Sequence, residues 1–503
     1  MEIELKLLLD PQHAAQLRAH PLLAQYAADE PVLLSMHDVY VDTPDLQLCR
    51  QQAGLRVRQV DGGWVQTLKA GGSVRGGLHS RHEWESEVAG PQPDLDALDA
   101  LIGRKQPVRA LLRQDGVRGK LQTIFTTRIE RTVWQLATPQ GDLVECVLDQ
   151  GVIEHRARSI PISEIELELK SGKASSLFDI ALALLQDVPL QVGQMSKAER
   201  GYRLAAAMPV EAARAQPLAL HGKLSVQQGF QAIAANCIEQ VSANQEGVAG
   251  GEDVESLHQM RVGLRRLRSA LSLFKARLQL PDSLQADLDW LVGTLGAARD
   301  WDVLAGDTLA QCDGEIDADV LAPLMAAVRE EARVAHAQAA EALAAPRYTQ
   351  LMLGLQRWLL EPGSGKLNQP LRRFATQALR QRQRRLLKRG KLLLRGTPDE
   401  RHQARIAAKK ARYASEFFAS LFSAGKVDAY IRRLSKLQDV LGVLNDLQVA
   451  DGLLQTLAGR QPAVQAQAAF VRGFLAARAH ERLADARNLQ RAWRCFRAAR
   501  LPA

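Results

Sequence analysis

The chain has 503 residues, of which 46% are hydrophobic and 24% charged, and a formal net charge of +9. This length and composition fit roughly two to four globular domains, and the excess of basic residues favours anionic partners. The five cysteines are scattered and show no C-x-x-C spacing, which argues against a disulfide framework and a zinc site. The sequence has no long apolar run that would predict a membrane span, and it starts with acidic rather than the basic residues of a signal peptide. We therefore expect a cytoplasmic protein without a membrane partner.

Short segments of alternating polar and apolar residues, separated by glycine-containing turns, fill the chain as far as about Tyr202. This pattern predicts an antiparallel sheet or barrel. The expected strands are Glu2–Leu8, His37–Asp42, Leu55–Val60, Trp64–Lys69, His82–Val88, Thr123–Leu136, Asp142–Glu154 and Glu164–Lys170. Helical segments are expected between them at Pro11–Ala27, Asp94–Ala100 and Ser175–Leu185.

From about Lys223 onward the chain becomes rich in Ala, Leu, Arg and Gln, which is typical of long helices. The segment between the two textures contains two prolines and little charge. We interpret it as a linker, with a helix capping the first domain as the alternative. The predicted organisation is a β-rich domain over residues 1–204, a linker over 205–221 and an all-helical domain over 222–503.

The helical part contains an internal repeat. Leu257–Phe274 matches Arg401–Phe418, with a histidine and several cations at equivalent positions. Further along, LGAARDWDVL at 295–304 resembles LGVLNDLQVA at 441–450. Two copies are too few for a solenoid, so the repeat predicts a paired helical bundle.

The predicted strands of the first domain carry charge on one face only. Glu2, Glu4 and Lys6 alternate with apolar residues, as do Glu164, Glu166, Glu168 and Lys170, while Arg56 and Arg58 form a similar pair. One such face is usually just solvated, but several together predict a barrel with a charged interior. Carboxylates suit Mg²⁺ or Mn²⁺, and Arg and Lys suit phosphate, so this interior could bridge a metal ion to a phosphate chain.

An ordered set of motifs adds a resemblance. E-x-E-x-K at the N-terminus is followed in order by YVDT, LRVR, TLK, RHEWE, TTR, LDQG, ELELKSG and SK. Residues 1–204 thereby resemble the CYTH, or triphosphate tunnel metalloenzyme, family. The resemblance implies an eight-stranded antiparallel β tunnel with flanking helices, which hydrolyses triphosphates with Mg²⁺ or Mn²⁺. The matched residues are Tyr40, Asp42, Arg56, Arg58, Lys69, Arg81, Glu83, Glu85, Arg128, Asp149, Glu166, Glu168 and Lys197.

The resemblance also assigns roles. The implied metal ligands are Glu2, Glu4, Glu166 and Glu168. The implied substrate-binding cations are Lys6, Arg56, Arg58, Lys69, Arg81, Arg128 and Lys197, of which Lys6, Arg56 and Arg58 form the catalytic set together with Glu166. Glu83, Glu85 and Asp149 stay open between metal, water-positioning and structural roles. One departure is Thr126, where the family often has Lys; nearby Arg131 is expected to face the other way by strand parity.

Basic residues recur at helical spacing in the second domain. His258, Arg261, Arg265 and Arg268 share one side of a helix, as do His402, Arg405, Lys409 and Arg412, and a further stripe holds Arg380, Arg384 and Lys388. An isolated run of this kind is usually a solvated face. Its duplication favours a bound anion, and the single aromatic residue in residues 371–412, Phe374, disfavours nucleic acid because base stacking needs aromatic platforms.

The pattern H-x-x-R-x-x-x-[RK]-[RK]-x-R, present twice and followed by LG-x-x-[RN]-D, resembles the CHAD domain over residues 222–503. That family is helical, binds inorganic polyphosphate and often follows a CYTH domain. Asp300 and Asp446 are expected to orient the basic residues rather than to catalyse.

Together these patterns predict an inorganic triphosphatase that converts tripolyphosphate and water into pyrophosphate and phosphate, with a polyphosphate-binding helical domain. The enzyme alternatives are an adenylate cyclase, a thiamine-triphosphatase or a nucleoside-triphosphatase. The non-enzymatic alternative is a polyphosphate-binding scaffold, which the clustered glutamates disfavour.

Overall fold

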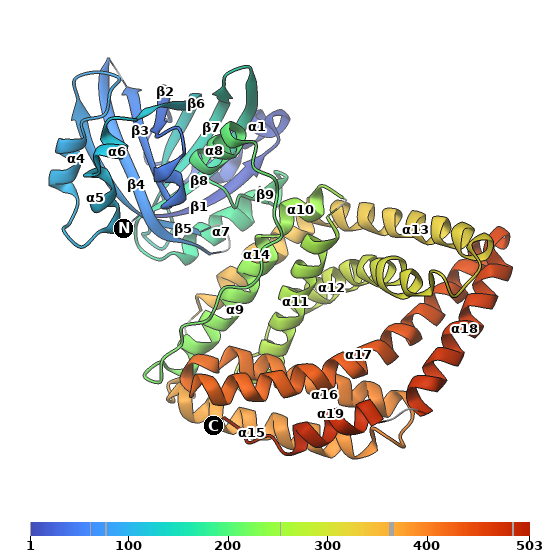
Figure 1. Cartoon of the computed structure of the whole chain (residues 1–503). Coiled ribbons are helices and arrows are strands. Elements are labelled where there is room, and N and C mark those ends of the chain that lie inside the picture. Colours follow the sequence, from blue (N-terminus) through green and yellow to red (C-terminus); the bar gives the residue numbers. More distant parts are fainter. Residues whose placement is uncertain are drawn as a thin grey trace. The chain divides into compact units, whose positions relative to one another are not determined.

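The computed structural model describes residues 2–60, 62–75, 78–251, 253–361, 367–484 and 487–502. It divides into two compact units (Figure 1). Unit 1 comprises residues 1–210 and 345–361, and unit 2 comprises residues 211–344 and 362–503. In the described part of the chain, no helix combines the length and hydrophobicity that a membrane crossing requires.

Unit 1 is built on an antiparallel sheet that closes on itself. The strand order is β5-β4-β3-β2-β6-β7-β8-β1-β9, and β1 also pairs with β5, so eight described strands form a closed ring and β9 is appended to β1. The predicted eight-stranded tunnel is confirmed. The strands are β1 Glu2–Leu9, β2 Val32–Asp42, β3 Ala53–Val60, β4 Gly63–Arg75, β5 Leu78–Val88, β6 Gln122–Ala137, β7 Leu143–His155, β8 Arg158–Ser171 and β9 Leu190–Val192.

The register of the strands decides which residues face the interior. Residues directly opposite one another on neighbouring strands lie on the same face of a sheet. Lys6 lies opposite Glu166, Asp149 opposite both Glu164 and Arg131, and Asp38 opposite Arg58. Charged residues of β1, β6, β7 and β8 therefore share the inside of the ring, as do those of β2 and β3, which is the charged interior that the alternating strands predicted.

The opposite face of the sheet is apolar and covered by helices. Leu55 and Leu68, which alternate with the charged residues of β3 and β4, pack with Leu98 and Leu112 in one buried cluster. Helices α4, α5 and α6 lie along the outer side of these strands (Figure 1). The helices of unit 1 are α1 Ala14–Arg18, α2 Pro21–Tyr26, α3 Gln47–Arg50, α4 Leu95–Leu101, α5 Pro107–Leu112, α6 Asp115–Arg118, α7 Ser175–Leu184, α8 Lys197–Ala206 and α14 Pro346–Leu359.

Helix α8 enters the tunnel from one end. Ser196 and Glu199 form a capping box that fixes its first turn. Gly201 lies so close to Phe125 that a Cβ atom would come within 2.2 Å of the ring, and the Tyr202 ring packs edge-on against Phe125. Because Phe125 shares the interior face of β6 with Arg131, this contact brings Lys197, the first residue of α8, to the charged interior.

The predicted domain boundaries differ from the compact units at one helix. Helix α14, within residues 222–503, packs against α7 and β9 of unit 1, and Arg357 Nε bonds to Asp179 Oδ1 at 2.7 Å. The predicted linker is helical only in its first residues, since α8 ends at Ala206. Residues 208–221 form no helix, and the Asn244 side chain bonds to both backbone groups of Ala213 at 2.8 and 2.9 Å, which ties this segment to unit 2.

Unit 2 is helical, as predicted, and its repeat is structural. In the first copy α9, α11, α12 and α13 contact one another in that order, and α15, α16, α17 and α18 do so in the second, while α11 packs on α16. The helices are α9 Val226–Ser242, α10 Gln245–Ala249, α11 Val254–Phe274, α12 Asp282–Asp302, α13 Ala318–Ala344, α15 Leu371–Arg389, α16 Pro398–Phe417, α17 Ala424–Arg460, α18 Gln465–Ala484 and α19 Arg487–Arg497, with a π-helix over Val303–Leu309 after α12.

Candidate functional site

Three carboxylates meet inside the tunnel of unit 1. Asp149 on β7 and Glu164 and Glu166 on β8 each offer an oxygen atom, and these atoms lie within 4.8 Å of one another. Asp149 and Glu164 are fully buried, and the side chain of Glu166 is 15% exposed. We call these three residues the acidic centre.

Two buried lysines hold the acidic centre together. Lys6 Nζ donates to Glu164 at 2.8 Å and also to Glu166. Lys197 Nζ lies 2.6 Å from Asp149, 2.5 Å from Glu164 and 2.9 Å from Glu166. Lys6 comes from β1 and Lys197 from the start of α8, so the two cations approach the same carboxylates from separate elements.

Two arginines complete the network. Arg131 donates through Nε and Nη2 to the two oxygens of Asp149, both at 2.7 Å, and Nη2 lies 3.3 Å from Glu166. Arg200 Nη1 donates to Glu164 at 3.1 Å. Each carboxylate of the centre therefore accepts from at least two cationic side chains.

The network keeps all these groups charged despite burial. Burial alone raises the pKa of Glu166, but the charges of Lys197 and Lys6 outweigh it and hold that pKa well below its ordinary value. Burial alone lowers the pKa of Lys197, but the carboxylates of Asp149 and Glu164 outweigh it and raise that pKa. The interior is thus a set of paired charges, as buried ions require.

A second charged group lies on β2 and β3. Asp38 is fully buried and accepts from Arg58 at 2.6 and 2.8 Å, while Arg56 Nη1 lies 3.6 Å away. The buried Nε of Arg56 has no hydrogen-bond partner among the described residues. On the next strands Lys69 Nζ lies 3.3 Å from Glu83. The predicted substrate cations Arg56, Arg58 and Lys69 therefore do share the interior face with Lys6.

The remaining predicted metal ligands lie further along the same faces. Glu168 stands opposite Glu4 across β8 and β1, and Lys170 Nζ lies 2.7 Å from Glu168. Glu2 pairs with Arg81 between β1 and β5, but both of these side chains lie outside the described residues. Carboxylate oxygens are the donors that Mg²⁺ and Mn²⁺ prefer, so the interior suits either ion chemically.

Two sequence predictions about β6 are wrong. Arg128 is on the outer face, where its side chain is 66% exposed and Nη2 bonds to Glu154 at 2.7 Å. Arg131 is the arginine of this strand that faces the acidic centre. The motif match predicted that Arg128 faces the interior, and strand parity then predicted that Arg131 faces outward. The observed register places Arg131 opposite Asp149, so both predictions are reversed.

Two further residues were missed from the sequence. Glu164 shares the charged face of Glu166 and Glu168 but was not among the predicted ligands, although it accepts from Lys6, Lys197 and Arg200. Arg200 lies one helical turn after Lys197, and this spacing is the signal that could have identified it.

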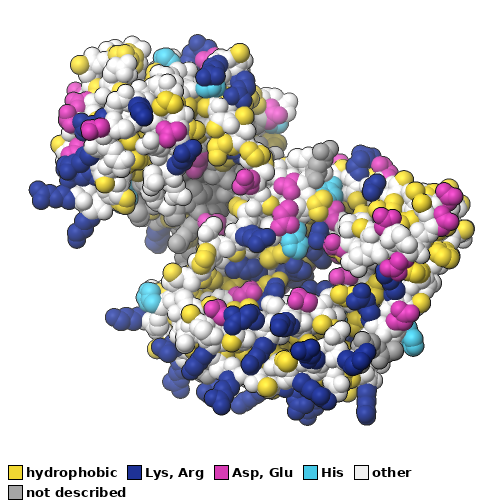
Figure 2. Space-filling view, viewed as in Figure 1, with side chains coloured by type: hydrophobic (Ala, Val, Ile, Leu, Met, Phe, Trp, Pro, Cys, Tyr) yellow, Lys and Arg dark blue, Asp and Glu magenta, His cyan; other side chains and the backbone are white. Residues whose placement is uncertain are grey.

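In unit 2 the repeated basic residues converge where α11 meets α16. The charge of Arg265 on α11 helps to lower the pKa of Arg261 on the same helix and of Arg405 and Lys409 on α16, and we call these four residues the basic cluster. Gly296 on α12 makes room for Arg261, because a Cβ atom there would lie 2.6 Å from its Nη1. Lys and Arg side chains gather around the hollowed middle of unit 2 and along its lower helices (Figure 2).

The basic cluster is not fully neutralised. Among the described residues its ion pairs are long, with 3.5 Å between Arg261 Nη2 and Asp300 Oδ1 and 3.9 Å between Arg405 Nη2 and Asp446 Oδ1. The buried Nε atoms of Arg265 and Arg405 have no hydrogen-bond partner among the described residues. Burial, joined by the charges of Arg405 and Arg265, lowers the pKa of Lys409 to about 7.

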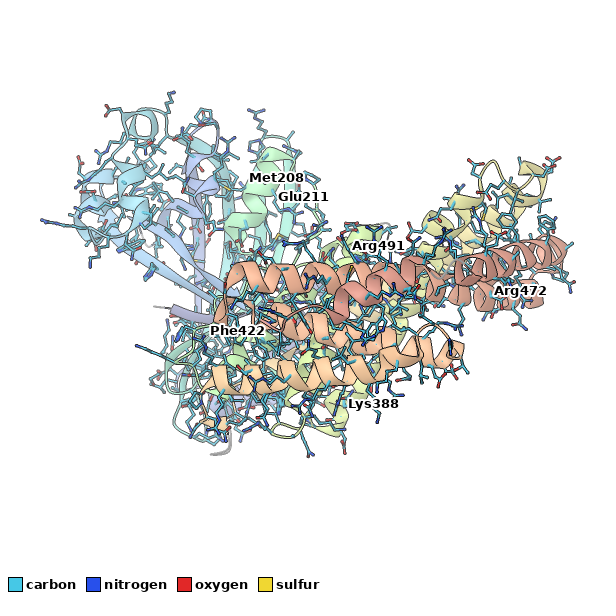
Figure 3. All side chains as sticks on the ribbon, turned by 60° about the horizontal axis from the view of Figure 1, so that its bottom comes forward. Met208, Glu211, Lys388, Phe422, Arg472 and Arg491 are labelled. Atoms are coloured by element: carbon cyan, nitrogen blue, oxygen red, sulfur yellow. The ribbon has the colours of Figure 1, made fainter. Side chains whose placement is uncertain are left out.

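The other predicted polyphosphate-binding residues lie around this cluster or away from it. Burial and the charges of Arg299 and Arg265 lower the pKa of His258, and His402 Nδ1 lies 3.3 Å from Asn445. Arg268 and Arg412 have acidic partners, Asp289 and Glu416, at 3.3 Å. The stripe on α15 is exposed, with Lys388 projecting from unit 2 in Figure 3; its members are Arg380, Arg384 and Lys388.

Comparison with known families agrees with this architecture. Residues 1–202 match the CYTH domain family and residues 232–455 match the CHAD domain family. The chain carries a CYTH domain followed by a CHAD domain. The CHAD domain is similar to the crystal structure of the CHAD domain from the plant Ricinus communis, with 41% identity, coverage of 58% of this chain and 99% of that chain, and a TM-score of 0.54.

The CYTH domain is similar to the inorganic triphosphatase of Haemophilus influenzae, with 38% identity over 208 residues, which are 40% of this chain and 54% of the relative. The chain therefore matches about half the length of this curated relative. A solved putative adenylyl cyclase from Hippeastrum is 21% identical, with coverage of 39% of this chain and 93% of that chain, and a TM-score of 0.29.

The reversed positions of the two β6 arginines give a stability test. Arg131→Met leaves the buried Asp149 with one cation fewer, which we expect to cost about 3 kcal/mol. Arg128→Met removes an exposed ion pair and should cost less than about 1 kcal/mol. Hydrogen exchange of peptides from β6 to β8 measures both changes, and equal protection in the two variants would contradict the placement.

Proposed function

We propose that the CYTH domain hydrolyses inorganic triphosphate to pyrophosphate and phosphate. The observation that carries the proposal is that clustered carboxylates and clustered Lys and Arg side chains share one closed interior face. Such an interior can hold a short, highly charged phosphate chain and the divalent ion that accompanies it. The similarity of this domain to an inorganic triphosphatase supports the same conclusion.

The cations of the interior are proposed to grip the phosphates. Lys6, Arg131 and Lys197 would hold one end of the chain beside the acidic centre, with Arg56, Arg58 and Lys69 along the neighbouring strands. Arginine can bind a phosphate through two N–H groups, and lysine supplies a movable point charge. Arg81 keeps its proposed substrate role from its backbone position opposite Glu2.

The carboxylates Glu2, Glu4, Glu166 and Glu168 are proposed to hold Mg²⁺ or Mn²⁺, with Asp149 and Glu164 beside them. When bound, the ion would neutralise charge that develops on the phosphate oxygens. The protein's own contribution is to fix the phosphate chain with paired cations before the reaction. Water would attack the terminal phosphorus, the bond from that phosphorus to its bridging oxygen would break, and the proton of the water would pass to the phosphate products or to solvent. The interior cations would stabilise the departing pyrophosphate oxygen.

The hydrolysis test compares substrates, metals and paired variants. The full chain should release phosphate from tripolyphosphate faster than from ATP or thiamine triphosphate, and only with Mg²⁺ or Mn²⁺. Glu4→Gln and Glu168→Gln should lower kcat/KM at least about a hundredfold, because each removes an interior carboxylate. Arg128→Ala, on the outer face, should stay within about twofold. Full activity of both glutamate variants would remove the proposed site, and a preference for ATP or thiamine triphosphate would change the substrate class.

We propose that the CHAD domain binds inorganic polyphosphate through the basic cluster. The cluster concentrates positive charge beside two long ion pairs, and among the residues that the structure describes the buried Nε atoms of Arg265 and Arg405 have no hydrogen-bond partner. A phosphate polymer supplies repeated anionic oxygens to both repeats at once. The exposed stripe of α15 is proposed to add a weaker, salt-sensitive attraction.

Paired substitutions separate the two basic surfaces. The double change Arg261→Ala with Arg405→Ala should weaken polyphosphate binding by at least about tenfold, because both residues are largely buried in the cluster. The double change Arg380→Ala with Arg384→Ala removes the same charge from an exposed face and should weaken binding only about two- to threefold. Calorimetric titration with polyphosphate of defined length measures both, and equal losses would point to nonspecific attraction.

Binding should also depend on pH. Lys409 is protonated below its pKa of about 7, where it adds a charge beside Arg405, Arg265 and Arg261, with Asp446 as the opposing anion. As pH rises above 7 the free protein loses this charge, so affinity should fall by up to about tenfold per pH unit. Lys409→Arg keeps the charge and should flatten the profile between pH 6 and 9. If the polyphosphate affinities of wild type and Lys409→Arg change equally with pH, this role of Lys409 is contradicted.

A further inference from the structure

The oxygens that would hold a divalent ion in the acidic centre are already engaged by the protein's own cations. Asp149 accepts from Lys197 and Arg131. Glu164 accepts from Lys6, Lys197 and Arg200, and Glu166 from Lys6, Lys197 and Arg131. A free divalent ion that entered here would meet four positive side chains around three negative ones.

Three of these four cations differ in how readily they can move away from the carboxylates. Arg131 is fixed by a two-pronged contact with Asp149. The stem of Lys6 is packed against Gly193, where a Cβ atom would lie 2.8 Å from its Cγ, and its carbonyl accepts from the Gly193 N–H at 2.9 Å. Lys197 stands at the first turn of α8 on a flexible four-carbon stem, so its ammonium group can change partners without displacing a strand.

Phosphate oxygens are the natural competitors for these ammonium groups. A triphosphate chain carries several negative charges, and both lysines can turn from a carboxylate to a phosphate without leaving the interior. When a lysine ammonium group moves to a phosphate, it frees a carboxylate oxygen, and the negative charge of the phosphate compensates the lysine. Glu164 is fully buried and bonded to three cations, and it can keep the network in place while Glu166 is released.

We propose that Lys6 and Lys197 are built-in counterions of the acidic centre, and that a divalent ion occupies this centre only together with phosphate. In the resting tunnel the two ammonium groups take the place of the ion. The ion then enters as a complex with the triphosphate, whose oxygens draw the lysines away. This inference rests on the proposed triphosphatase function and concerns the order in which its parts assemble.

The test measures binding of Mn²⁺ alone, in the absence of any phosphate compound. The full-length protein is titrated with MnCl₂, and bound ion is followed by electron paramagnetic resonance and calorimetry. Wild type should show no site at the acidic centre below millimolar concentration. Lys197→Met removes one counterion and should bind Mn²⁺ at least tenfold more tightly. Adding Glu166→Gln to this variant should abolish the gain, which would locate the new site.

A matched control makes the same chemical change on the surface. Lys173 is exposed, and Lys173→Met should leave Mn²⁺ binding as in wild type. Melting curves check that each variant folds, and Lys6→Met replaces Lys197→Met if the latter unfolds. If neither lysine variant folds, the wild-type titration decides alone: tight binding of free Mn²⁺ that Glu166→Gln removes overturns the proposal, and its absence supports it.

The outcome can be separated from that of the proposed function. Wild-type protein that binds free Mn²⁺ at the acidic centre as tightly as Lys197→Met, yet hydrolyses tripolyphosphate, overturns only the counterion role. Wild-type protein that fails to hydrolyse tripolyphosphate with any divalent ion overturns the proposed function, whatever its Mn²⁺ binding.

Discussion

Closure of the β-sheet of unit 1 imposes the constraint on which its interior depends: a charge inside the ring must be balanced by another charge. Desolvation of an unpaired ion costs far more than a domain can tolerate. The acidic centre therefore exists only because Lys6, Lys197, Arg131 and Arg200 reach it. Their positions on β1, β6 and α8 explain why the termini of this domain and its middle strands must come together before the site is complete.

The two units handle charge in opposite ways. In the tunnel, anionic and cationic side chains lie at hydrogen-bond distance from one another, so each charge of the acidic centre is paired within the protein. In the described part of the basic cluster of unit 2, the ion pairs span 3.5 and 3.9 Å and the buried Nε atoms of Arg265 and Arg405 have no hydrogen-bond partner. Where cations are already paired with carboxylates, they can exchange these partners for the oxygens of a short anion. Where cations are only loosely paired, they attract an anion from solution. The proposed triphosphatase site and the proposed polyphosphate-binding surface thus differ in how their cations are paired.

The duplication in unit 2 explains how the basic cluster arises. A single helix presents its cations to solvent, where they repel one another and gain little. Packing α11 on α16 sets the cations of two copies side by side and removes part of their water. The resulting positive electrostatic potential depends on both copies of the repeat. Lys409 stands where the other copy has an arginine, and its pKa of about 7 gives the cluster a group that titrates near neutral pH.

The sequence by itself determined the strands, the repeat and the charged face of each strand, because alternation and helical spacing are local properties. It also placed Lys6, Arg56, Arg58 and Glu166 on the interior through strand alternation, while Lys197 was assigned only by the family resemblance. Only the tertiary structure decided the register of β6, which puts Arg131 inside and Arg128 outside. It alone showed that Glu164 accepts from Lys6, Lys197 and Arg200, and that α14 is a helix of unit 1. Register and docking depend on contacts between segments far apart in the chain, and a local pattern holds no information about them.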